Sequence, residues 1–164
     1  MAHSAKAIAN AFLNLAAQHG EDVGPLKLQK LVYYAAGYYA GAYNEPLLSS
    51  SLEAWEHGPV APDLYREFKE FGRNPITRLA TDFDDDFELE EVPIPTEDKR
   101  AMGVVNFVWT TYKKYTGLQL SDMTHADGTP WATTRAATGS VKNAKISHEA
   151  LHEYFSSLIK PKAA

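Results

Sequence analysis

The segment from Pro25 to Tyr43 constrains the fold more than any other part of the chain. Its aliphatic side chains recur at helical spacing, and tyrosines rather than charged residues fill much of the remaining circumference. The segment also contains a set of small residues, namely Ala35, Ala36, Gly37, Ala40 and Gly41. A helix that is apolar on most sides has to be covered by other elements, and small side chains let those elements approach closely. The sequence therefore predicts a central helix packed on most sides.

Helical periodicity and capping residues predict further helices on both sides of this segment. They are expected at residues 3–19, 64–71, about 96–115, 118–126 and 131–137, and in a last helix between Ser147 and Pro161. Ser4, Thr96 and Ser147 are the expected N-caps. Short strands are expected at residues 52–55, 76–79 and 87–92, the last two paired around an acidic turn. Residues 56–62 are expected to form a loop.

The length of 164 residues fits one domain. We therefore expect a mainly α fold in which residues 1–164 form a single compact helical domain. This domain is built around the central buried helix, with a small β element, a short hairpin.

Cysteine is absent from the chain, which excludes disulfides, thiolate catalysis and cysteine-bound zinc. No run of apolar residues approaches the length that a membrane span requires. The first residues lack the basic-then-apolar pattern of a secretion signal. These features predict a cytoplasmic protein without a membrane span.

The net charge of −5 is unevenly distributed. Seven acidic residues lie between Asp82 and Glu91, and without them the rest of the chain carries about +2. A protein without a basic footprint is poorly suited to bind phosphate, so nucleic acid is not expected as the main ligand. The acidic strip either mimics nucleic acid or meets a basic surface of a partner protein, or it is a solvated loop that maintains solubility.

Residues His148 to His152 fit the zinc-protease pattern H-E-x-x-H. A third ligand for the metal is missing downstream, because Glu153 is the one candidate there and it lies on the wrong face of the helix. A solvated helix face is the preferred interpretation. The sequence also lacks the nucleophile elbow, the phosphate-binding loop and the dinucleotide fingerprint. We therefore expect no enzyme activity, no catalytic residues, no metal and no cofactor.

His57 and His125 each lie beside glycine, proline and tryptophan. Carboxylates are near both in the sequence, namely Glu53, Glu56 and Asp63 on one side and Asp122 and Asp127 on the other. If the two loops meet, a histidine–carboxylate cluster is one outcome. Backbone hydrogen bonding of each histidine in its own tight loop is the preferred interpretation.

Lys27 and Lys30 lie one helical turn apart at the start of the central helix, and Tyr34 continues their row. Such a basic and aromatic row is able to bind an acidic partner or to stack on bases. The alternative is a solvated edge whose lysine stems are buried while their ammonium groups reach water.

Three blocks of residues carry a family resemblance. The first is Lys27-Leu28-Gln29-Lys30-Leu31-Val32-Tyr33-Tyr34-Ala35, followed by Gly37. The second is Ala54-Trp55-Glu56-His57-Gly58-Pro59-Val60, with Tyr65. The third is Leu120-Ser121-Asp122-Met123-Thr124-His125, with Pro130-Trp131. With Ile146-Ser147 before the last helix, these blocks resemble the SocA-like (Panacea-domain) antitoxins, a group that includes GepA-like and phage-associated proteins. The acidic insertion at 82–91 is not part of the family pattern.

The resemblance implies an antitoxin that neutralises a cognate toxin by direct protein–protein binding. The alternatives are a protease adaptor or a phage-associated host-modulating protein, and after these a metal-dependent enzyme. The implied partner is a toxin protein, with a protease complex as the alternative. The motif residues are candidates for partner binding or for a purely structural role: Lys27, Gln29, Lys30, Tyr33, Tyr34, Trp55, His57, Gly58, Pro59, Tyr65, His125, Pro130 and Trp131.

Overall fold

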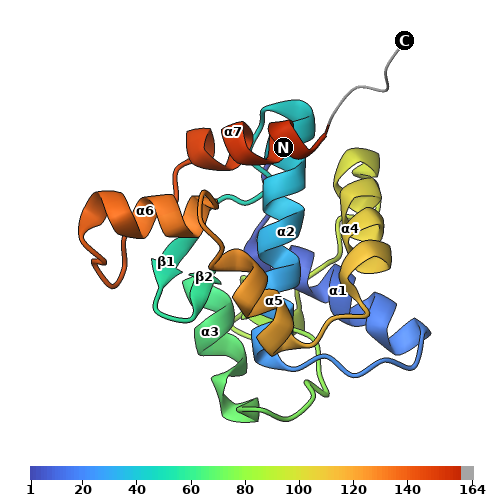
Figure 1. Ribbon diagram of the computed structural model, residues 1–164. Helices are drawn as coiled ribbons and strands as arrows, with labels where there is room; N and C mark the ends of the chain where they lie inside the picture. Colours follow the sequence, from blue (N-terminus) through green and yellow to red (C-terminus); the bar gives the residue numbers. More distant parts are fainter. Residues whose placement is uncertain (160–164) are drawn as a thin grey trace.

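The computed structural model describes residues 1–159 and has the predicted mainly α architecture with a small β element (Figure 1). Its helices are α1 (Ala5–Gln18), α2 (Pro25–Tyr43), α3 (Pro62–Phe68), α4 (Lys99–Tyr112), α5 (Gly117–Thr124), α6 (Pro130–Thr138) and α7 (His148–Leu158). A 3-10 turn, η1 (Lys69–Phe71), follows α3. The strands β1 (Glu53–Trp55) and β2 (Gly58–Val60) form one antiparallel hairpin, and β3 (Thr81–Phe83) and β4 (Leu89–Glu91) form another.

Helix α2 is the central helix that the sequence predicts, with the predicted bounds. Figure 1 shows it surrounded by α1, α4, α5 and α7. A Cβ atom added to Gly37 would overlap the ring of Phe155 in α7, and one added to Gly41 would lie 2.8 Å from the Phe155 backbone. The small residues thus permit the close approach of α7. None of the helices in residues 1–159, this one included, combines the length and apolar character needed to cross a bilayer.

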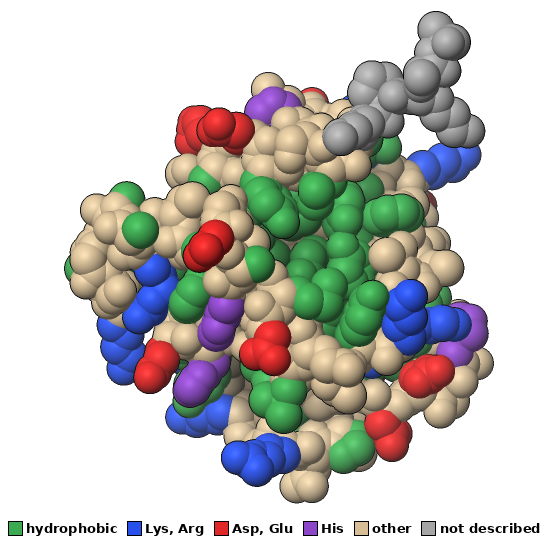
Figure 2. Space-filling model, in the orientation of Figure 1, with side chains coloured by type: hydrophobic (Ala, Val, Ile, Leu, Met, Phe, Trp, Pro, Cys, Tyr) green, Lys and Arg blue, Asp and Glu red, His purple; other side chains and the backbone are tan. Residues whose placement is uncertain are grey.

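Aromatic side chains join α2 to its neighbours. Tyr34 stacks on Tyr112 of α4 with ring centroids 4.3 Å apart, and Tyr38 meets Phe155 edge-on at 5.0 Å. The hydroxyl groups of Tyr38 and Tyr112 share a hydrogen bond of 2.7 Å. Figure 2 shows the hydrophobic surface that gathers over α2 between α4 and α7. Because aromatic pairs have preferred geometries, these contacts fix how the helices are placed as well as burying them.

The β elements differ from the sequence prediction in two places. Strand β4 lies within the predicted strand 87–92, but its partner is β3 rather than residues 76–79. Residues 76–79 are held against the α1–α2 loop and α3 instead, because the Ile76 N–H donates to the Val23 carbonyl at 2.9 Å and Arg78 pairs with Glu67. Residues 58–60, predicted as loop, form β2, because residues 56–57 make a tight turn that returns the chain onto β1.

Ser4 and Ser147 cap α1 and α7 as predicted. The prediction of Thr96 as the cap of α4 is wrong: Asp98 has this role, and its carboxylate accepts from the Ala101 N–H at 3.1 Å. Helix α4 also ends at Tyr112, earlier than predicted, because Thr116 caps α5 through a capping box. Helix α3 begins at Pro62, two residues before the predicted span 64–71, because the proline fits its first turn, and the last turn of that span is η1. The predicted stop at Pro161 lies outside the described residues.

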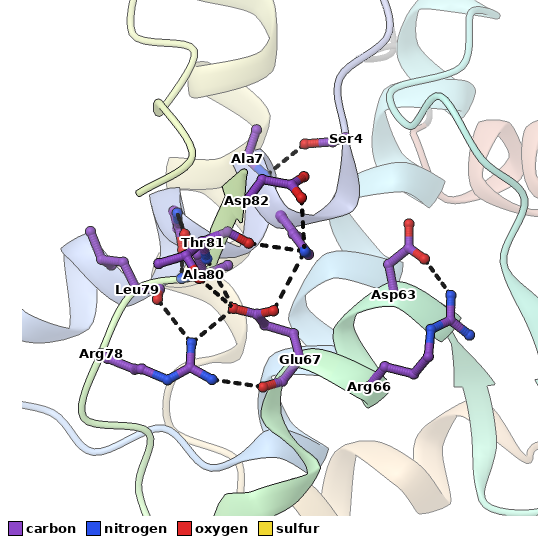
Figure 3. A network of polar contacts seen from close by, with 12 residues as sticks. Ser4, Ala7, Asp63, Arg66, Glu67, Arg78, Leu79, Ala80, Thr81 and Asp82 are labelled. Carbon is purple, nitrogen blue, oxygen red and sulfur yellow. Dashed lines mark hydrogen bonds and ion pairs between the residues drawn. The ribbon is translucent and has the colours of Figure 1, made fainter. Parts of the chain in front are cut away.

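The β3–β4 hairpin is anchored at its base by a polar network (Figure 3). Glu67 of α3 accepts from the Thr81 N–H at 2.9 Å and from Arg78 at 2.8 Å, and Lys6 of α1 lies 3.4 Å from it. Lys6 also donates to the Thr81 carbonyl at 3.0 Å. Burial alone would raise the pKa of Glu67, but the Thr81 and Arg78 hydrogen bonds and the Lys6 charge lower it below its ordinary value.

Candidate functional site

Two consecutive side chains of α2 bind the backbone around β2. Lys30 donates from Nζ to the Pro59 carbonyl at 3.0 Å. Gln29 donates to the Ala61 carbonyl at 3.0 Å and accepts from the Ala61 N–H at 2.8 Å. Lys30 is fully buried, and this burial lowers its pKa to about 7. The first sequence block therefore holds the second block in place.

Side chains of α5 and α6 also bind the backbone of this hairpin. The donors and their carbonyl acceptors are Ser121 to His57 at 2.7 Å, Trp131 to Trp55 at 2.6 Å and Arg135 to Ala54 at 3.0 Å. Ser121 and Trp131 belong to the third sequence block. All three blocks thus meet at β1–β2, where side chains satisfy backbone carbonyls that a third strand would otherwise satisfy.

Gly58 occupies a position that other residues fit poorly. Its φ of +117° lies in the region that favours glycine. A Cβ atom there would lie 2.8 Å from Nζ of Lys30 and 3.0 Å from Oγ1 of Thr124. The glycine therefore lets the hairpin close over the Lys30 ammonium.

The loops of His57 and His125 do meet, through the Ser121 hydrogen bond to the His57 carbonyl. Their imidazoles differ in setting: His57 is exposed, whereas His125 stacks on Trp131 with centroids 4.0 Å apart. Burial, and then the charge of Lys30, lower the pKa of His125. Within residues 1–159, no three histidine or carboxylate side chains are grouped so as to hold a metal ion. The geometry here is that of a packed aromatic pair.

The histidines of the H-E-x-x-H match have partners of their own. His152 contacts the Ala40 carbonyl through Nδ1 at 2.9 Å, and His148 contacts the Asn44 side-chain oxygen through Nε2 at 3.0 Å. The two rings stack with centroids 6.3 Å apart. These contacts dock α7 against the end of α2.

A groove of about 770 Å³ opens between the start of α2, the β1–β2 hairpin and α3. We call it the motif groove. Its lining is mainly apolar, and its residues come from several elements: Pro25, Leu26, Gln29, Lys30, Trp55, Glu56, His57, Val60, Leu64, Tyr65, Phe68, Lys69, Gly72, Arg135, Ser140 and Lys142. Trp55 meets Tyr65 edge-on at 5.0 Å, and Tyr65 is 49% exposed. The groove thus presents two aromatic rings to solvent beside an apolar floor.

The candidate residues divide between the motif groove and the interior. Gln29, Lys30, Trp55, His57 and Tyr65 line the groove. Gly58, Pro59, His125, Pro130 and Trp131 support it from behind or from the side, through the contacts described above or by burial.

Lys27, Tyr33 and Tyr34 do not line the groove. Tyr33 and Tyr34 are core residues, at 1% and 6% exposure. Lys27 donates to the Lys113 carbonyl at 2.6 Å. Because Lys30 does not reach water, the first block does not form a solvated row of lysines. Burial lowers the pKa of Lys27, as it does for Lys30.

Three cations of the motif groove belong to no sequence motif: Lys69, Arg135 and Lys142. Of these, only Arg135 could have been noticed in the sequence, because it lies one helical turn after Trp131. In the structure its guanidinium lies over the Trp131 ring, 5.2 Å from the ring centroid. Lys69 and Lys142 are brought together by the tertiary fold, which local sequence patterns do not encode.

The comparisons with known proteins agree on one family. The sequence pattern of the family described as "Antitoxin SocA-like, Panacea domain" matches residues 28–132. The chain is 34% identical over 127 residues to "Antitoxin SocA" of Caulobacter vibrioides (strain NA1000 / CB15N), which covers 77% of this chain and 68% of that protein. No solved structure matches the chain significantly. With three signature blocks meeting around one hairpin and most of the chain aligned, this protein belongs to the SocA-like, Panacea-domain antitoxin family.

Proposed function

We propose that the protein is an antitoxin that neutralises a cognate toxin by direct binding, and that the motif groove is the contact site. One observation carries this assignment. Trp55, His57 and Tyr65, from the second signature block, line one open groove, while residues of the first and third blocks hold its wall from behind. The structural and the partner-binding interpretations of the motifs therefore apply to different residues of the same site.

The groove has the character of a binding hot spot. Exposed tyrosine and tryptophan rings at the centre of an interface contribute most of the binding free energy in many complexes. Here the two rings belong to elements fixed by side-chain hydrogen bonds, so little conformational entropy is lost when a partner binds them. Binding at such a site neutralises a toxin by covering the part of the toxin that enters the groove.

The test is a toxicity-rescue assay with the protein encoded by the neighbouring reading frame. Growth arrest by that protein should be relieved by coexpression of this chain, and the two should purify together. Tyr65→Ala should weaken the affinity by about tenfold or more, as expected for an aromatic hot spot. Phe107→Ala is the matched control, because Phe107 is 50% exposed on α4 and does not line the groove.

Two results would contradict the proposal. If no neighbouring protein is toxic, the antitoxin role fails. If rescue occurs but Tyr65→Ala binds as tightly as Phe107→Ala, the role stands and the assignment of the groove fails.

A further inference from the structure

We propose that the motif groove recognises a segment of the toxin that combines apolar or aromatic side chains with carboxylates. This inference rests on the proposed function and names the chemistry of the partner. It is carried by three features of the groove: its apolar floor, its cationic rim and the absence of acidic partners for the rim cations among the described residues.

The apolar floor sets the size of what binds. Leu26, Val60, Leu64 and Phe68 line it together with Trp55. A volume of about 770 Å³ lies within the range of pockets that enclose a drug-sized ligand. A folded domain is far too large for it, whereas a few consecutive side chains of a peptide segment fit.

The rim sets the charge of what binds. Lys69, Arg135 and Lys142 contribute three cations to the rim, against the single carboxylate of Glu56. The chain as a whole carries a net charge of −5, so this is a local reversal of sign. Figure 2 shows Lys and Arg side chains beside histidine along the edge of the molecule near α6 and the β1–β2 hairpin. Charge complementarity therefore favours an acidic segment.

The rim cations are available to such a segment. Among residues 1–159, no ion pair involves Lys69, Arg135 or Lys142. Arg135 is held in place by its hydrogen bond to the Ala54 carbonyl and by the Trp131 ring, yet that bond uses one of its N–H groups. A guanidinium fixed in this way is prepared to bind a carboxylate.

A second copy of this chain is the competing occupant. The β3–β4 hairpin carries the same chemistry, because Phe83 and Phe87 are 65% and 84% exposed among seven carboxylates. We assign the groove to the toxin because an antitoxin whose groove was filled by its own hairpin would have to dissociate first.

The experiment selects from a library of random peptides displayed on phage, with the full-length protein as bait. Wild-type protein should enrich peptides in which Asp or Glu adjoins aromatic or aliphatic residues. Synthetic peptides of the enriched sequences should change Trp55 fluorescence, and this signal should be lost in Trp55→Phe. This readout needs no toxin, so its failure is distinct from the failure of the rescue assay.

Charge reversal then tests the rim. The double variant Lys69→Glu, Lys142→Glu should bind the selected peptides at least about tenfold more weakly, because two attractive charges become repulsive. The matched control is Lys99→Glu, Lys114→Glu, which changes the net charge equally at exposed sites on and after α4. Binding to the control should stay within about twofold of wild type, and added salt should weaken wild-type binding.

Three outcomes would overturn the inference. One is enrichment of basic or wholly polar peptides, and another is equal binding by the two double variants. The third is self-association of the protein, seen as a mass that increases with its concentration. If both the double variant Phe83→Ser, Phe87→Ser and the rim charge reversal abolish this association, the occupant of the groove is a second copy of the chain.

Discussion

The two hairpins are of the same size and differ in almost everything else. Each has two strands of three residues. Strand β2 is buried throughout, and β1–β2 receives side-chain hydrogen bonds from α2, α5 and α6. Strand β4 is exposed throughout, and β3–β4 is held at its base alone. Because an isolated two-stranded hairpin is marginal in water, each needs support from outside, and the location of that support decides which surfaces stay free.

The register of β3–β4 shows what remains free there. Phe83 lies opposite Leu89 on one face of the hairpin, and Asp82 lies opposite Glu90 on the other. Asp82 lies 3.7 Å from Lys6, so the charged face turns toward α1 and the apolar pair is left uncovered. In β1–β2 the buried face carries the support and the aromatic Trp55 faces the motif groove. The comparison predicts large effects of substitution in the first hairpin and small ones at the tip of the second.

The largest effect is expected for Gly58→Ala. The substitution places a Cβ at a φ of +117° and 2.8 Å from the buried Lys30 ammonium, so it should lower the free energy of unfolding by about 3–4 kcal/mol. Urea unfolding measures this loss. Gly72→Ala is the control, because Gly72 also has a positive φ but has nothing within 4 Å of the added Cβ. Equal losses in the two variants would mean that the contact of the added Cβ with Lys30 does not contribute to the loss of stability.

The next effect is expected at the base of the second hairpin. Glu67→Ala removes the acceptor of the Thr81 N–H and of Arg78, and should lower the free energy of unfolding by about 2–3 kcal/mol. Hydrogen exchange should increase at the amides of residues 81–91 and stay unchanged in β1–β2.

Glu70→Ala is the control for that variant, because Glu70 is 63% exposed and pairs with Arg78 at the surface. Its loss of stability should be under about 1 kcal/mol. In wild type the lowered pKa of Glu67 means that its contribution is present at neutral pH and is lost as the pH falls through the pKa of the folded protein. A uniform increase of exchange in both hairpins would contradict the view that each is supported separately.

The third effect is a pH dependence of stability that arises at the first hairpin, where Lys30 is buried. Lys30 has a pKa of about 7 in the folded protein, against roughly 10.4 for an unfolded lysine. Between these values the unfolded state binds more protons, so stability should rise by about 2 kcal/mol from pH 7 to pH 9. Urea unfolding at both values measures the slope. Lys30→Met should remove most of it and leave the smaller contribution of Lys27, whose pKa is also lowered. A slope unchanged in Lys30→Met would show that the ammonium reaches water.

Much of the fold follows from local patterns, and α2 is the clearest case. Its bounds, its burial and the close approach at Gly37 were predictable because periodicity and residue size are properties of a contiguous segment. The caps at Ser4 and Ser147 followed from their position before an apolar run. Asp98 was missed because Thr96, two residues earlier, is also a good capping residue, and the contact of Asp98 with His3 at the other end of the chain is not part of any local pattern.

The site was predictable in its residues but not in its arrangement. The motif blocks pointed to Trp55, His57 and Tyr65, yet Gly58-Pro59 indicated a loop because proline donates no hydrogen bond to a ladder. Residues 58–60 form β2 because Lys30 of α2 donates a hydrogen bond to the Pro59 carbonyl. This contact joins residues far apart in the sequence. The rim cations Lys69 and Lys142 gave no signal for the same reason: only the packing of α3 and the segment after α6 brings them to one groove.

The smallest effect is expected at the tip of β3–β4, and its sign is the opposite of the others. Phe87 has a φ of +58° and is 84% exposed, so it has a strained backbone and little burial to offset the strain. Phe87→Gly should therefore raise the free energy of unfolding slightly, by about 0.5 kcal/mol, since relief of the strain exceeds the entropy that glycine adds to the unfolded chain. Phe83→Gly, at a regular position of β3, should lower it. Thermal unfolding of both variants measures the difference. If Phe87→Gly is destabilising, the ring contributes packing at the tip. If Phe87→Gly is stabilising, the stability of the fold does not explain why an aromatic residue occupies this position. The tip then differs from Gly58, where the residue that the backbone conformation favours is also the one that stabilises the protein.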